Sequence, residues 1–199
     1  AESLPTVTAD FGLVHGASGS ASVRIGATEA VCSIFGPRVE SSGGGVFSDS
    51  GRIAVDVRYG VFAGPAPNRS LSSAESESSL AERLLDALNT TVCLQKYPKC
   101  TISVFVVISQ SCGSELSAAL AACSLALVDA AIEVADIIAP CTALLRNDSI
   151  DLYPVLSKRC PSDVFVTAAY SPALDSFPQL YLRGRVDVQT MVKLFEIAK

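Results

Sequence analysis

Residues 114–131 form a helix-length run that is apolar almost all round, and this run constrains the fold more than any other part of the chain. A surface helix keeps one polar face, whereas a helix that lacks one has to be covered on most of its sides. Gly113 separates this run from residues 101–108, a strand-like segment rich in β-branched residues. We therefore expect the helix to lie in the interior, packed against a sheet.

The composition is that of a globular protein. A chain of 199 residues with 49% hydrophobic residues can bury a sizeable core, and we expect a single domain over residues 1–199. The longest apolar runs are too short to cross a bilayer, and no charged start followed by an apolar signal segment opens the chain. We expect a soluble, intracellular protein with no membrane partner.

Several function classes are disfavoured by the residue types. The net charge is −5 and aromatic residues make up 7%, which argues against a free-standing nucleic-acid-binding module. The seven cysteines include no C-x-x-C pair, so we expect buried free thiols rather than a zinc site. His15 is the single histidine, which gives Ser-His-Asp catalysis little support.

The first 60 residues alternate between strand-like segments and turns. The expected strands cover residues 11–15, 20–25, 30–35 and 52–58. The expected turns are residues 16–19, residues 26–28 and the Gly36-Pro37 dipeptide. Short turns between consecutive strands predict an antiparallel meander for the first three strands.

Helices and further strands follow. Ser72 and Glu75 have the spacing of a capping box, and an apolar stripe then recurs every four residues at Leu80, Leu84, Leu88 and Val92. Further strands are expected at residues 100–109, 137–145, 164–170 and 180–182, with a last amphipathic helix at 188–195. This order of elements predicts an α+β, or split α/β, fold.

Residues 12–40, GLVHGASGSASVRIGATEAVCSIFGPRVE, resemble the opening hairpins of the RNase PH fold, in which a G-S-A motif, a G-x-T turn and a G-P dipeptide recur at this spacing. The later stretches GRIAVDVRYGVFAG, LQKYPKCTISVFVVIS and SAALAACSLALVDAAIEVADII resemble later elements of the same fold in order. Ala131 stands where the family has a glycine. The resemblance implies antiparallel and mixed sheets packed against two central helices and a C-terminal helix.

The resemblance also implies where phosphate would be held. Active members of the family cleave RNA from its 3′ end by phosphorolysis, and they use a G-G-T-R-T type of turn at the start of the apolar helix. Residues 112–116 of this chain read CGSEL, with no arginine. Unpaired N–H groups at a helix start favour an anion, but Glu115 places a negative charge there. We expect Gly113, Ser114 and Glu115 to form a degenerate phosphate site, with Glu115 complementing the helix N-terminus.

A second expectation concerns the acidic residues. Active members are similar to one another in two aspartates spaced six apart, which correspond here to Ser157 and Asp163. One of the two acids is therefore missing, and Lys158 and Arg159 reverse the local charge. This degenerate acid site argues against bound magnesium, and we expect no catalytic residue, no metal and no cofactor.

The function implied by the resemblance is that of a noncatalytic RNase-PH-like ring subunit of the eukaryotic RNA exosome, in the nucleus, nucleolus and cytoplasm. Its partners would be other RNase-PH-like ring subunits, exosome cap proteins, and RNA in the assembled channel. Arg38, Arg58 and Arg69 are the candidates for RNA contact, because Arg38 follows the G-P dipeptide and the other two lie at or near a loop.

Two alternatives stay open at this point. The first is an active phosphate-dependent 3′–5′ exoribonuclease that recruits a cation from elsewhere, such as Lys158 or Arg159. The second is a free-standing RNA-binding module, for which a basic patch with interleaved aromatic residues is expected.

Overall fold

The computed structural model describes residues 5–39, 49–63, 72–146, 149–154, 164–185 and 191–192. The first of its two sheets contains β1 (Val7–Phe11), β2 (Gly19–Ile25), β3 (Thr28–Val39), β4 (Arg52–Tyr59) and β5 (Cys100–Gln110). The spatial order is β1-β2-β3-β5-β4. Strands β1, β2 and β3 pair antiparallel, which confirms the expected meander, whereas β4 and β5 are parallel. A parallel pair needs a long crossover, and here the crossover contains helix α1 (Ser72–Thr91) and the short 3₁₀ helix η1 (Leu94–Lys96).

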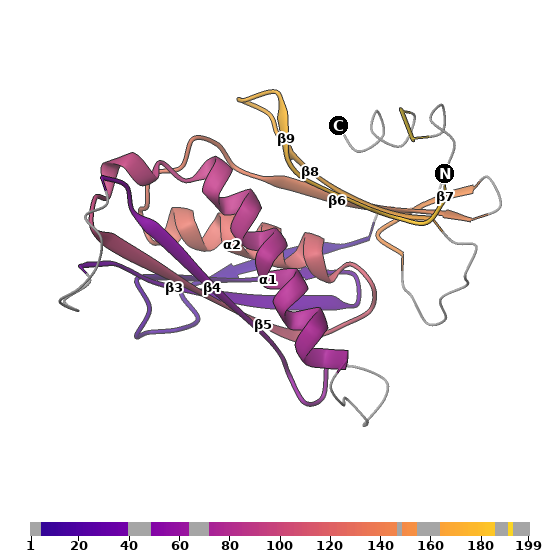
Figure 1. The fold of residues 1–199 in the computed structure, drawn as a ribbon. Helices are drawn as coiled ribbons and strands as arrows, with labels where there is room; N and C mark the ends of the chain where they lie inside the picture. The colour runs from indigo at the N-terminus through magenta and orange to yellow at the C-terminus, as the bar shows by residue number, and fades with distance from the viewer. Residues whose placement is uncertain are drawn as a thin grey trace.

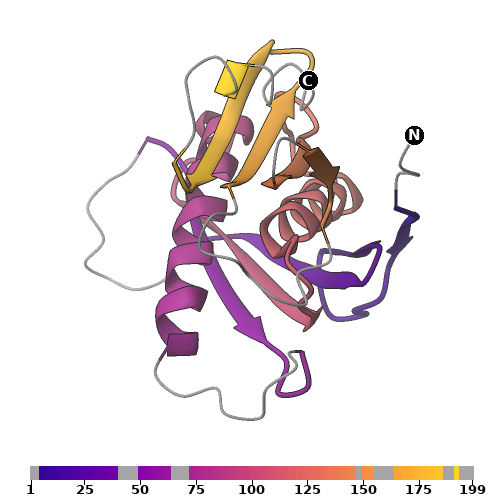
Figure 2. The same cartoon turned by 90° about the vertical axis from the view of Figure 1, so that its right-hand side faces the viewer.

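The second sheet is antiparallel throughout. It contains β6 (Ala139–Arg146), β7 (Ser149–Leu152), β8 (Val164–Ser171) and β9 (Ser176–Arg183) in the order β7-β6-β8-β9. Helices α1 and α2 (Glu115–Asp129) lie between the two sheets (Figures 1 and 2). Helix α2 contacts β2 and β3 on one side and β6 and β8 on the other, so the fold has three layers.

This arrangement explains why α2 has no polar face. Most of its residues from Leu116 to Leu127 are buried, as the sequence predicted. The few hydroxyls it carries are paired inside the core: Ser117 Oγ lies 2.5 Å from Thr142 Oγ1, which lies 3.3 Å from Thr167 Oγ1. These hydrogen bonds connect α2 to β6 and β8, and no buried side-chain nitrogen or oxygen lacks a hydrogen-bond partner among the described residues.

Helix α1 is amphipathic, and its predicted stripe is confirmed. Leu80, Leu84, Leu88 and, just beyond the helix, Val92 are buried in the main core. The side chains of residues 72–75, and with them the expected capping box, lie outside the described residues. On another side of the helix, the Arg83 guanidinium lies 3.7 Å from the centre of the Tyr181 ring on β9, which is a cation–π contact between α1 and the second sheet.

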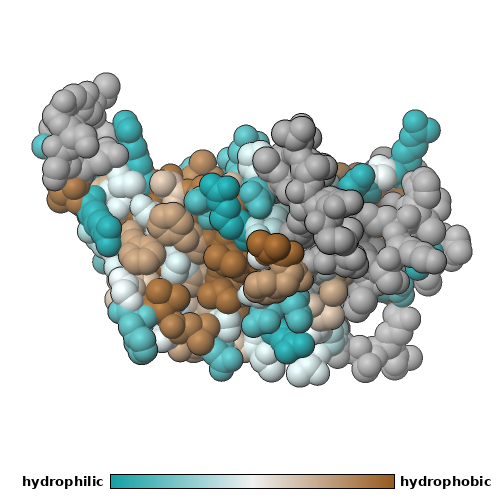
Figure 3. Space-filling model, turned by 90° about the horizontal axis from the view of Figure 1, so that it is seen from below, coloured by the Kyte–Doolittle hydropathy of each residue, from teal (hydrophilic) through white to brown (hydrophobic). Residues whose placement is uncertain are grey.

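The outer face of the first sheet carries exposed apolar side chains. Phe105 and Val107 on β5 are 42% and 43% exposed. Phe35 on β3 packs edge-to-face against Phe105, with ring centres 5.7 Å apart. Apolar side chains gather on the side of the molecule where this sheet lies (Figure 3). A patch of this kind is typical of a surface that another macromolecule covers.

Some expected boundaries were wrong. The strand expected at residues 11–15 was misplaced: β1 covers Val7–Phe11, and the chain leaves the extended conformation at Gly12, which has φ +71°. Gly36-Pro37 is not a turn between strands but lies within β3, where the pairing with β5 shifts register between Phe35 and Arg38. Strand β7 was not expected at all, since four residues carry too little pattern.

Other expectations concern parts of the chain that the structure does not describe. The C-terminal helix expected at residues 188–195 lies outside the described residues except for 191–192, as does the loop at 41–45. Six of the cysteines are described, and all six are free thiols. Neither α1 nor α2 is long and apolar enough to cross a membrane.

Candidate functional site

The candidate site is the turn between β5 and α2. Strand β5 ends at Gln110, and the Ser111 N–H donates to the Ala63 carbonyl at 2.8 Å. Gly113 then has φ +120°, a conformation that side chains disfavour, and Ser114 follows as the N-cap of α2. Ser114 is buried, and its side chain makes no capping hydrogen bond.

Glu115 forms hydrogen bonds within this turn. Its Oε1 accepts a hydrogen bond from the Ser111 hydroxyl at 2.5 Å and one from the Gly113 N–H at 3.3 Å. Its carboxylate therefore folds back over the start of α2, where the helix dipole favours a negative charge. Glu115 is the acidic residue in the first turn of α2.

The electrostatics of this turn oppose a second anion. No lysine or arginine forms an ion pair with Glu115 among the residues that the structure describes. A phosphate placed about 4 Å from the carboxylate would be repelled by about 1 kcal/mol per unit charge in water and by about 4 kcal/mol near a protein surface. The dipole of α2 stabilises an anion at this position by only about 0.3–1 kcal/mol. The turn formed by Ser111, Gly113, Ser114 and Glu115 therefore disfavours phosphate.

The two positions of the degenerate acid site are not part of the described structure. Ser157 and Asp163, together with the neighbouring Lys158 and Arg159, lie outside the described residues. Within the described ranges, no group of three His, Cys, Asp or Glu side chains converges to hold a metal ion.

The two candidate arginines that the structure describes, Arg38 and Arg58, lie on the first sheet and not at the α2 turn. Arg38 on β3 pairs with Thr101 at the start of β5, roughly 33 Å of strand away from Ser111. Its guanidinium lies 5.5 Å from the centre of the Phe35 ring, and it forms no ion pair among the described residues. Arg69 lies outside the described residues.

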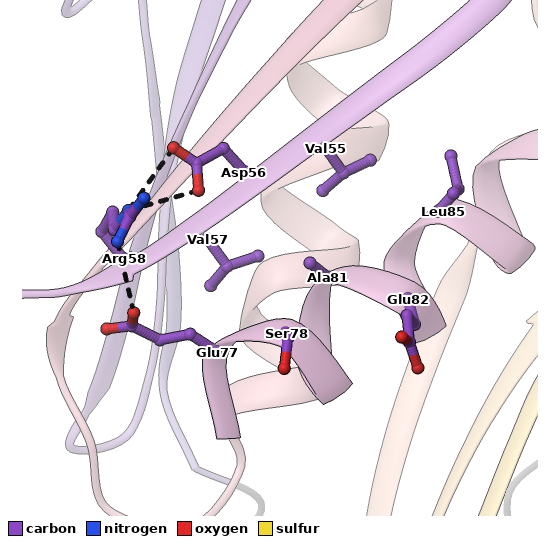
Figure 4. Close-up of a pocket in the computed structure, with 9 residues that line it drawn as sticks. All are labelled: Val55, Asp56, Val57, Arg58, Glu77, Ser78, Ala81, Glu82 and Leu85. Atoms are coloured by element: carbon purple, nitrogen blue, oxygen red, sulfur yellow. Dashed lines mark hydrogen bonds and ion pairs between the residues drawn. The ribbon is translucent and has the colours of Figure 1, made fainter. Parts of the chain in front are cut away.

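Arg58 is held by carboxylates instead. Its Nε lies 3.2 Å from Asp56 Oδ1 on the same strand, and its Nη1 lies 3.7 Å from Glu77 Oε2 on α1 (Figure 4). Because two acids already flank it, Arg58 is a weaker candidate for RNA contact than Arg38. The sequence could not reveal this, since Glu77 meets β4 only through the tertiary structure.

The G-S-A motif has a structural role that sequence reasoning missed. A Cβ atom on Gly19 would lie 2.3 Å from the backbone nitrogen of Ala130, so only glycine fits between β2 and the end of α2. Ser20 Oγ accepts the Val14 N–H at 2.9 Å, and the Ser20 N–H donates to Asp129 Oδ2 at 2.9 Å. The motif therefore joins β2 to the C-terminal end of the buried helix.

Curated relatives of this chain are exosome components. A protein described as exosome complex component RRP41-like from Arabidopsis thaliana is 34% identical over 173 residues, which cover 87% of this chain and 66% of that protein. Human exosome complex component MTR3 is 35% identical over 149 residues, covering 69% of this chain and 54% of that protein. The chain thus spans just under two thirds of the Arabidopsis relative and about half of the human one.

Solved structures share the fold. The crystal structure of rice (Oryza sativa) Rrp46 has a TM-score of 0.81 and 19% identity, covering 98% of this chain and 87% of that one. The Archaeoglobus fulgidus exosome, solved with RNA bound to its active site, has a TM-score of 0.78 and 18% identity, covering 98% and 85%. At these identities the similarity shows the fold, which is the RNase PH fold with two sheets around two helices.

A family model assigns the chain directly. Residues 4–133 match RNase PH, described as the 3′ exoribonuclease family, domain 1, and this match covers more than half of the chain. It spans the first sheet, both helices and the α2 turn. The sequence, the fold and this match agree, and the chain belongs to the RNase PH family of 3′ exoribonucleases.

Proposed function

We propose that this chain is a noncatalytic RNase-PH-like subunit of the RNA exosome ring, and that residues 1–199 act as one RNase-PH-like domain. The observation that carries this proposal is the contact of Glu115 Oε1 with the Gly113 N–H and the Ser111 hydroxyl. A phosphorolytic site needs a cation that holds phosphate, whereas this turn presents a carboxylate and no arginine.

Its partners would be other RNase-PH-like ring subunits, exosome cap proteins, and RNA in the assembled channel. The curated relatives are exosome components, which supports this role. The exposed apolar face of the first sheet around Phe105 and Val107 also suits a subunit that is covered by a neighbour. Arg38 is the preferred RNA contact among the described candidates, and the chain would act in the nucleus, nucleolus and cytoplasm.

Among the subunit types, we propose the one represented by human MTR3. Sequence identity alone does not distinguish the subunit types, because human MTR3 is 35% identical to this chain and the Arabidopsis RRP41-like protein is 34% identical. The arginine-free α2 turn supports the choice of a noncatalytic type. A ring in which this chain occupies another subunit's position would overturn this assignment.

The proposed function is tested by assembly and by activity in parallel. The chain is co-purified with tagged ring partners, and the isolated chain is assayed with 3′-labelled RNA, inorganic phosphate and magnesium. We expect stable incorporation into the ring and no phosphate-dependent shortening of the RNA. Shortening that requires phosphate and disappears in Asp163→Ala would overturn the proposal and support the active exoribonuclease.

A further inference from the structure

A groove of about 370 Å³ lies between β4 and α1, far in sequence from the α2 turn (Figure 4). Its floor is apolar: Val55 and Val57 extend from β4 toward α1, where Ala81 and Leu85 face them. Val57 is fully part of the core, whereas the other three are only partly buried. An apolar floor that remains partly open to solvent can contact a further side chain.

One wall of this groove is the edge of the first sheet. Strand β4 is the last strand in the sheet order, and no strand pairs with its outer side in the part of the chain that the structure describes. The Gly60 N–H donates to the Ile108 carbonyl of β5, so the N–H groups of every second residue before it point toward β5 as well. The N–H groups of Ile53, Val55 and Val57 therefore point outward.

Tyr59 shows how this edge takes a hydrogen-bond acceptor. Its outward N–H donates to Glu77 Oε1 at 3.1 Å, so a carboxylate of α1 occupies the place of a carbonyl on a neighbouring strand. Glu77 closes the edge at the C-terminal end of β4. Within the described residues, no strand pairs with the outward N–H groups of Ile53, Val55 and Val57, so these groups can pair with another chain. Unpaired strand edges of this kind readily pair with another chain.

The charge around the groove is negative. Asp56, Glu77 and Glu82 line it, and Arg58 is the basic residue among the lining side chains. Arg58 is already engaged by the first two acids, whereas Glu82 is exposed and forms no ion pair within the described residues. A net charge of −2 on a strand edge favours a basic occupant.

We propose that an extended, basic segment of a partner protein adds to the outer edge of β4 as a further strand. Its backbone pairs with the outward groups of Ile53, Val55 and Val57, and its apolar side chains face α1 and contact Ala81 and Leu85. Its basic side chains alternate with these and lie on the face of Asp56, while Glu82 at the rim adds attraction for the charged segment. This is recognition by strand addition, in which backbone hydrogen bonds contribute affinity and the groove contributes selectivity. It does not depend on the noncatalytic assignment.

The test uses a seven-residue peptide of alternating lysine and valine as the probe, with the purified chain. Binding is followed by fluorescence anisotropy at low salt, and amide hydrogen exchange is measured by NMR. We expect saturable binding and slower exchange at Val55 and Val57. The Ala54 amide points toward β5 and should not change.

Matched variants separate the groove from general charge attraction. Glu82→Lys should weaken binding about fivefold, because it replaces an attraction by a repulsion at the rim. Asp86→Lys makes the same charge change one turn along α1, outside the groove, and should leave affinity unchanged. Equal loss in both variants would overturn the proposal.

Backbone pairing is tested separately. A peptide N-methylated at every residue has no N–H left on either edge, so it cannot form a strand ladder and should not bind. Equal binding of the methylated peptide, unchanged exchange at Val55, or no binding of the parent peptide at millimolar concentration would each overturn the proposal. Displacement of the peptide by single-stranded RNA that binds more tightly to the Glu82→Lys variant would overturn the proposal and assign the groove to nucleic acid instead.

Discussion

The Ser111 hydroxyl donates to Glu115 Oε1 at 2.5 Å, and this hydrogen bond closes the turn between β5 and α2 with a carboxylate. The same oxygen accepts the Gly113 N–H at 3.3 Å. The start of α2 therefore carries the chain's own negative charge. Glu115 stabilises the fold at this turn and disfavours an anionic ligand there.

Removing this carboxylate should lower stability. Glu115→Gln should reduce the free energy of unfolding by about 0.5 kcal/mol, because the charge at the start of α2 is lost. Glu115→Ala should reduce it by about 1–2 kcal/mol, because the hydrogen bonds from the Ser111 hydroxyl and the Gly113 N–H are lost as well. Urea unfolding followed by circular dichroism measures both. The matched change Glu82→Gln on the exposed side of α1 should have little effect, and equal losses at the two positions would contradict a structural role for Glu115 at this turn.

Ala131→Gly should stabilise the protein by about 0.5–1 kcal/mol. Ala131 follows α2 with φ +52°, and the Ile132 N–H donates to the Leu127 carbonyl at 3.1 Å in the pattern of a Schellman motif. This is the position at which the family resemblance predicts glycine.

Ala130→Gly is the control for this change. Ala130 has φ −72°, which suits alanine, so the same substitution one residue earlier should be destabilising. Thermal unfolding compares the two variants with the natural chain. A decrease in stability for Ala131→Gly would show that the left-handed conformation at this residue is not strained.

Gly19→Ala should destabilise the protein by about 2–3 kcal/mol, because the added methyl group would lie 2.3 Å from the Ala130 nitrogen and 2.6 Å from the Ala126 carbonyl oxygen. Moving the backbone atoms of a buried helix away from this methyl group would cost free energy, because the helix is packed on most of its sides. Gly16→Ala has open space around its Cβ and should change stability by less than about 0.5 kcal/mol. Chemical unfolding of both variants checks the contrast, and similar values would show that β2 and α2 can separate without cost.

Asp136 should contribute a pH-dependent part of the stability. Its Oδ2 accepts the Ser171 hydroxyl and the Ala173 N–H, both at 2.6 Å, and these bonds hold the pKa of the carboxyl below its ordinary value. A carboxyl with a lowered pKa in the folded state stabilises the protein above its unfolded pKa, and this contribution is lost as the pH falls through the folded pKa.

Asp136→Asn should therefore be less stable than the natural chain at pH 6, and the difference should shrink as the pH falls below about 4. Unfolding curves recorded between pH 3 and pH 7 measure the change. A difference that stays constant over this range would mean that the Asp136 charge does not contribute.

Local pattern was sufficient to predict most elements of the described fold. The run at 114–131, apolar almost all round, predicted an interior helix, and the four-residue stripe from Leu80 to Val92 predicted one buried face of α1. Both predictions succeed because helix periodicity is a property of neighbouring residues. The arginine-free turn at 112–116 is likewise visible in the residues alone. What pattern could not detect was β7, since four residues are too short to show a period.

The tertiary structure decided the contacts between residues far apart in the chain. Gly19 meets Ala130 and Arg58 meets Glu77 only because packing brings β2 to the end of α2 and β4 to the start of α1. Such contacts depend on how the layers stack, which no local pattern encodes. The same stacking leaves the outer edge of β4 beside an apolar groove, and it turns the side chain of Glu115 back onto the end of β5 instead of outward to a ligand.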